Sequence, residues 1–87
     1  MLATGPTSPV AGECYGSPKE VASLIRRTRV AAGLTQLRLA RRLGCSQSVV
    51  ARWETGVHEI TLRTMARIAD ALGTQLLVRF GEASEVR

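Results

Sequence analysis

Apolar residues recur at helical spacing in four successive segments of the chain. In the first segment Val21, Leu24 and Ile25 share one face. The preceding run Ser17–Glu20 combines a capping serine, a proline suited to the first helical position and a glutamate that completes a capping box. Gly33 then offers a residue that ends a helix in the left-handed conformation. We therefore expect the first helix to lie between the capping serine and this glycine.

Three further segments repeat this pattern, because each begins with a hydroxyl side chain that can cap a helix and ends at a glycine. They are Thr35–Gly44, Ser46–Gly56 and Thr61–Gly73. The apolar positions that we expect to face the interior are Leu39, Ala40, Leu43, Val49, Val50, Trp53, Leu62, Met65, Ile68, Ala69 and Leu72. Four helices joined by such short turns predict a compact all-α bundle over residues 17–73.

The two ends of the chain carry different patterns. Residues 1–16 contain Gly, Pro, Ser and Thr without an apolar period, and we expect a flexible tail there. Residues 74–81 alternate in a way that is typical of a short β-strand, with a fifth helix or a packed tail as alternatives. A single strand in a helical chain needs a partner for its backbone groups, and a second copy of the chain is the simplest one. The residues assigned to this dimerisation strand are Leu76, Leu77, Val78, Arg79 and Phe80, and residues 82–87 are expected to form a second flexible tail.

Composition and charge narrow the classes of partner. Hydrophobic residues make up 45% of the chain but aromatic residues only 3%, which suits small packed helices. The formal net charge is +5 and the isoelectric point is about 10.6. Residues 17–56 carry eight basic side chains against two acidic ones, and all but one of the eight are arginines. This excess indicates a polyanionic partner, although a solvated basic surface would give the same composition.

The sequence carries few features of metal-binding, catalytic or membrane proteins. Cys14, Cys45 and His58 match no metal-binding spacing, so we expect no metal and no cofactor. No nucleophile–base set, paired carboxylates or glycine-rich phosphate loop is present, which argues against an enzyme and against a small-molecule substrate. We see neither a membrane-spanning run nor a signal peptide, and we expect a cytoplasmic protein without a membrane partner.

The second and third helices have the features of a tight two-helix corner. With Gln36 as the first helical residue, Ala40 lies where the two backbones would come closest, so only a small side chain fits. Gly44 falls in the turn, where positive φ lets the chain reverse. Val50 and Trp53 would then point back into the core from the second helix of the pair.

The runs GLTQLRLARRLG, SQSVVARWETG and ITLRTMARIADALG, over about residues 20–73, resemble the Cro/phage-repressor helix-turn-helix family, also called XRE. The resemblance implies a four-helix lambda-repressor-like domain that binds double-stranded operator DNA as a homodimer. It also implies that residues 46–55 form the recognition helix, which enters the major groove.

The resemblance assigns roles to individual residues. Those expected to contact base edges are Gln47, Ser48, Ala51 and Arg52, and those expected to contact phosphate are Gln36, Arg29, Ser46, Arg42, Thr55 and Arg63. Arg29 is also expected to form a structural salt bridge with Glu54. Two departures from the family pattern weaken the phosphate assignment after the recognition helix, because Thr55 stands where Asn is usual and the loop Val57–Glu59 lacks basic residues.

The ending LGTQLLVRF is similar to that of antitoxins of the HigA and HipB types, in which a C-terminal strand pairs across the dimer. These features suggest a repressor that binds a palindromic operator in its own promoter, with a toxin as a further partner. A stand-alone or prophage-type regulator and a protein-interaction module that has lost DNA specificity are the alternatives.

Overall fold

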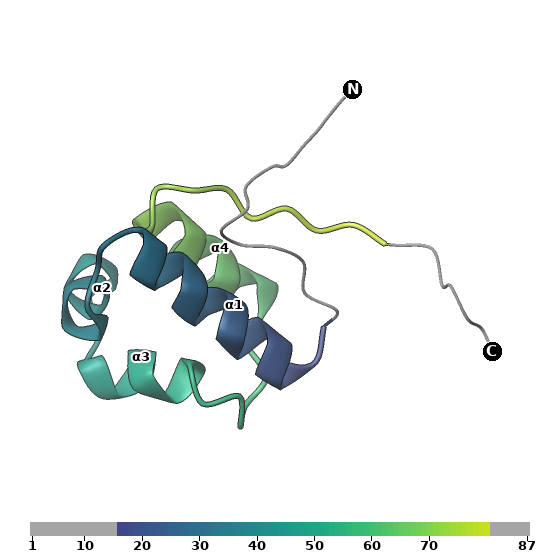
Figure 1. The fold of residues 1–87 in the computed structure, drawn as a ribbon, viewed down its shortest axis with the longest axis horizontal. Helices are drawn as coiled ribbons and strands as arrows, with labels where there is room; N and C mark the ends of the chain where they lie inside the picture. Colours follow the sequence, from purple (N-terminus) through teal and green to yellow (C-terminus); the bar gives the residue numbers. More distant parts are fainter. Residues whose placement is uncertain (1–15, 81–87) are drawn as a thin grey trace.

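The computed structural model describes residues 16–80, and the expected tails therefore lie almost wholly outside the described residues. The described residues form four helices, which gather into one body (Figure 1). In chain order they are α1 (Pro18–Ala31), α2 (Gln36–Leu43), α3 (Gln47–Trp53) and α4 (Leu62–Ala71). The predicted all-α architecture of four helices is confirmed.

Each helix begins at the capping residue that the sequence indicates. The hydroxyls of Ser17, Thr35, Ser46 and Thr61 each accept a hydrogen bond from the backbone N–H three residues further on. At α1 the capping box is complete, because the Glu20 carboxylate also accepts from the backbone N–H of the capping serine at 3.3 Å. A cap of this kind typically contributes about 1 kcal/mol, so local sequence fixes where every helix starts.

The core lies where α2 packs against both α3 and α4. Leu39, Ala40 and Val50 are completely buried at its centre. Ala40 thus occupies the position of close approach that its small side chain predicts, and Trp53 lies half-buried against the same core. Leu62 departs from prediction, since it is 61% exposed. It is the first residue of α4 and precedes the turns of that helix that reach the core.

Two arginines join α2 to α4 at their C-terminal ends. Arg42 of α2 donates a hydrogen bond to the carbonyl of Ala71, the last residue of α4, at 2.9 Å. Arg67 of α4 donates to the carbonyl of Leu43, the last residue of α2, at 3.0 Å. Each cation therefore satisfies a carbonyl that the other helix leaves unpaired, at the end where the helix dipole favours positive charge.

The segment after α4 ends that helix and then runs on without regular structure. The backbone N–H of Thr74 donates to the carbonyl of Ala69 at 2.9 Å, which closes the last turn. Residues 75–80 form no strand in the single described chain (Figure 1). Neither side of the expected strand is buried, with Leu77 83%, Val78 63% and Phe80 101% exposed. A strand that needs a second copy cannot form in one chain, and its pairing stays a prediction.

Gly56 is the glycine whose surroundings are most constrained. Its φ is +78°, and a Cβ built on it would lie 2.9 Å from the backbone Cα of Lys19 in the first turn of α1. Gly44 has a similar φ of +73° but no heavy atom within 4 Å of the same position. The turn after α3 therefore packs directly on α1, and only glycine fits there.

We expect Gly56→Ala to destabilise the domain more than Gly44→Ala does. The left-handed conformation costs either alanine about 1–2 kcal/mol. The contact with Lys19 adds overpacking of about 1–3 kcal/mol at position 56 alone. Denaturant unfolding of the two variants measures the difference in unfolding free energy. Equal losses would show that the approach to α1 is not constraining.

Candidate nucleic-acid interface

Helix α3 presents its polar side chains to solvent at and after its N-terminal end. Gln47 and Ser48 occupy its first two positions and Arg52 lies one turn beyond, and all three are exposed. Ala51 is half-buried, so less of its methyl group is available to a partner. The opposite face carries Val50 into the core. The structure thus brings the four residues expected to contact bases onto one short helix.

A buried ion pair anchors the end of α3 to α1. The guanidinium of Arg29 donates to both carboxylate oxygens of Glu54, from Nε at 2.6 Å and from Nη2 at 2.9 Å. Its Nη1 donates to the carbonyl of Leu34 at 2.8 Å. The two side chains are only 10% and 4% exposed. This is the pair that the family resemblance implies, and its bidentate geometry is the strong form of the interaction.

The Arg29 guanidinium stays charged throughout the neutral range. The hydrogen bond to Glu54 raises the pKa of Arg29, burial lowers it, and the charge of the carboxylate raises it further, with a net upward effect. A raised pKa means that the folded state holds this proton more tightly than the unfolded state. The stabilisation is therefore complete below the ordinary arginine pKa and is lost only under strongly alkaline conditions.

Two hydrogen bonds between side chains connect the Glu54 carboxylate to Gln36 and then to Gln47 on the predicted DNA-facing surface. Nε2 of Gln36, the first residue of α2, donates to Oε1 of Glu54 at 3.1 Å. Nε2 of Gln47, the first residue of α3, lies 3.5 Å from Oε1 of Gln36, a long hydrogen bond. Sequence reasoning placed both glutamines at the interface but missed their link to Glu54, because no local pattern predicts a contact between side chains 18 residues apart.

The remaining residues expected to contact phosphate differ in their exposure and in their bonds within the protein. Arg29 is buried and engaged through three nitrogens, which leaves it a structural role, and Arg42 is held at the end of α4 by its bond to a carbonyl. The hydroxyl of Thr55 donates to the Arg52 carbonyl at 2.7 Å and accepts from the backbone N–H of Val57. It therefore stabilises the turn after α3. Ser46 and Arg63 are exposed, the first as the cap of α3 and the second in the first turn of α4.

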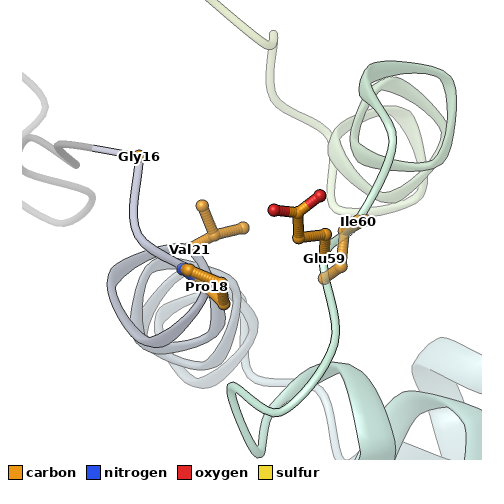
Figure 2. Close-up of a pocket in the computed structure, with 5 residues that line it drawn as sticks. All are labelled: Gly16, Pro18, Val21, Glu59 and Ile60. Carbon is orange, nitrogen blue, oxygen red and sulfur yellow. The ribbon is translucent and has the colours of Figure 1, made fainter.

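A shallow cavity of about 260 Å³ lies between the start of α1 and the loop before α4 (Figure 2). Figure 2 shows Glu59 beside the apolar side chains of Val21 and Ile60. Glu59 is the one titratable side chain among the lining residues, so the cavity contains no acid–base pair. Among residues 16–80 no cluster of three or more His, Cys, Asp or Glu side chains could hold a metal ion.

We expect Arg29→Ala to lower the free energy of unfolding by about 3–5 kcal/mol, because it leaves the Glu54 carboxylate buried without its cation. Arg26→Ala, on the exposed side of the same helix, should change it by less than about 0.5 kcal/mol. The double variant Arg29→Met/Glu54→Leu should recover part of the loss, since neither charge is then buried. Urea unfolding distinguishes these cases, and a double variant as unstable as Arg29→Ala would contradict this account.

Comparison with known protein families identifies the family of this chain. Residues 25–78 match the family described as Helix-turn-helix (HTH_3), which covers the second half of α1, all of α2 to α4 and the start of the last segment. No curated protein matches the chain. Within the described residues, no helix has the length and apolar character required to cross a membrane. The chain belongs to the XRE- and Cro-like helix-turn-helix family of DNA-binding regulators, a family that is not usually catalytic.

Proposed function

We propose that this protein is a sequence-specific transcriptional regulator that reads double-stranded DNA with α3. The observation that carries the proposal is the placement of Gln47, Ser48 and Arg52 on the exposed side of a helix whose far end is fixed by the buried ion pair. A recognition helix lies in the major groove and presents polar side chains from its N-terminal part to base edges. Here α3 is supported by the core on one side and by the Arg29–Glu54 bridge at its end.

The side chains of α3 define the expected contacts. The amide of Gln47 matches the donor and acceptor of adenine in the major groove, and Arg52 matches the acceptors of guanine. Ser48 can bond to either a base or a phosphate, and Ala51 offers a methyl group to thymine. These chemistries point to a half-site of mixed sequence.

The charge of the domain suits a phosphate backbone. Residues 16–80 carry eleven Lys and Arg side chains against four acidic ones. Among the phosphate candidates, Ser46 and Arg63 are exposed and Gln36 is half-buried, whereas Arg42 and the hydroxyl of Thr55 are bonded to carbonyls within the protein. Binding should therefore weaken steeply with added salt, since each phosphate contact releases counterions.

The segment 74–81 supports a homodimer as the DNA-binding unit. Its described part exposes the apolar side chains of Leu77, Val78 and Phe80, and residues 75–80 lie outside regular structure. Pairing with the same segment of a second copy would satisfy the backbone and gather Val78 and Phe80 of both protomers on one face of the paired strands. A two-fold dimer reads a palindromic operator, with half-sites roughly 34 Å apart.

The most specific form of the proposal is an autoregulatory repressor that acts at its own promoter. The similarity of the C-terminal segment to HigA- and HipB-type antitoxins suggests a toxin as a further protein partner. A stand-alone or prophage-type regulator would use the same interface without that partner. The exposed apolar segment also supports a second candidate, a protein-interaction module without DNA specificity, which would bind all duplexes equally.

Substitution of Gln47 tests base reading. We expect Gln47→Ala to reduce the preference for the duplex upstream of the gene over a scrambled duplex by about 1–3 kcal/mol, because the amide contact to one base is lost. Fluorescence anisotropy at several salt concentrations measures both affinities. The fold should persist, since Gln47 is exposed.

The matched control is Ser23→Ala, which removes an exposed polar side chain from α1, outside the residues assigned to DNA or to the dimer, and should leave the preference unchanged. Equal and steeply salt-dependent binding of the wild-type protein to both duplexes would argue for binding through charge alone at that promoter.

Removal of the C-terminal segment tests the dimer. A chain that ends at Thr74 keeps the N–H that caps α4 and should fold as a monomer with much weaker operator binding. A chain that ends at Phe80 keeps the whole described segment and should behave as the full protein does. Analytical ultracentrifugation reports the oligomeric state, and a dimer that survives the shorter truncation would refute strand pairing.

A further inference from the structure

We propose that Glu54 is a positioning residue for base reading as well as a partner of the buried arginine. Its carboxylate fixes the orientation of the Gln36 amide, which in turn fixes the orientation of Gln47. This inference rests on the proposed function, in which Gln47 contacts a base.

The first step follows from what a carboxylate can do. Both oxygens of Glu54 only accept hydrogen bonds, and Arg29 holds them in place within the protein. The Gln36 amide lies 3.1 Å from Oε1 of that carboxylate. It must therefore turn its NH2 group toward Glu54, and its carbonyl oxygen then faces away from α1.

The second step carries this orientation to α3. The Gln36 carbonyl oxygen lies 3.5 Å from Nε2 of Gln47 and can only accept. Gln47 must turn its NH2 group toward α2, which leaves one N–H and the neighbouring Oε1 for another partner. A donor beside an acceptor is the pattern that pairs with N7 and N6 of adenine. The buried carboxylate thus selects one of the two amide orientations of Gln47.

The double substitution Arg29→Met/Glu54→Leu should remove this order. It takes away the carboxylate that accepts from Gln36, together with the cation that would otherwise stay buried without a partner. The Gln36 amide can then take either orientation. Gln47 no longer has its NH2 group held toward α2, so it can present an oxygen and an N–H to adenine or its NH2 group alone to guanine.

Selection from a library of double-stranded DNA with randomised half-sites tests this loss of order, with affinities then measured on matched duplexes. The base pair read by Gln47 is the one whose preference Gln47→Ala removes. At that base pair the full-length wild type should prefer adenine roughly tenfold or more. Arg29→Met/Glu54→Leu should show no preference there, and neither should Gln36→Met, which keeps the Arg29–Glu54 pair. Preferences at other base pairs should not change.

A purely structural role for Glu54 gives a different result. Both variants would then lose affinity for all duplexes equally and keep the wild-type base preference, which would overturn the proposal. Circular dichroism establishes whether Arg29→Met/Glu54→Leu is folded at the assay temperature. If it is not, Gln36→Met decides, because loss of preference at the one base pair supports positioning and retention of preference refutes it.

Failure of the proposed function is recognised separately, as a wild-type protein that selects no sequence. The positioning itself can then be measured without DNA by NMR relaxation of the side-chain amide of Gln47. An amide that is restrained in the wild type and mobile in Gln36→Met supports the link from Glu54 through Gln36. Equal mobility in the two proteins overturns it.

Discussion

The bridge between Arg29 and Glu54 is the interaction on which the rest of the structure depends. It crosses from α1 to the end of α3, and its two side chains are almost completely withdrawn from water. Burial of one of these charges alone would be unfavourable, so the domain is stable only when α1 and α3 meet in this one register. The same guanidinium bonds to the Leu34 carbonyl, which also fixes the turn between α1 and α2.

Two small residues, together with the ion pair, fix the position of α3. Ala40 is fully buried in α2 where that helix packs against its neighbours, and Gly56 brings the turn after α3 onto the first turn of α1. A larger side chain at either position would push α3 away from the body. Since α3 has only seven residues, it would not be stable as an isolated helix. The packing around α3 therefore sets its orientation, and this orientation sets where the exposed side chains of α3 lie.

Much of this fold could be predicted from the sequence because its determinants are local. The caps at Ser17, Thr35, Ser46 and Thr61 and the glycines after the helices act within a few residues, and the apolar period is read directly from the chain. The Arg29–Glu54 pair came instead from resemblance to a family. The bonds of Arg42 and Arg67 to the ends of the opposite helices were not foreseen, because an exposed arginine has many reachable carbonyls and only the tertiary arrangement selects one. Leu62 fits the apolar period but is exposed at the start of α4. Leu77, Val78 and Phe80 fit the strand pattern but are exposed in the single chain.

The position of Glu54 shows how one residue of a small domain can both stabilise the fold and order the side chains that we propose contact DNA. Its carboxylate can accept more hydrogen bonds than Arg29 donates to it, and it also accepts from the half-buried Gln36. In a domain without a large core, rigidity at the interface has to come from groups that already hold the fold together. A binding helix that moved independently of the core would lose conformational entropy on meeting its partner, whereas one fixed by a buried ion pair has lost it during folding. The chain thus places its most constrained charge next to the side chains that we propose read DNA.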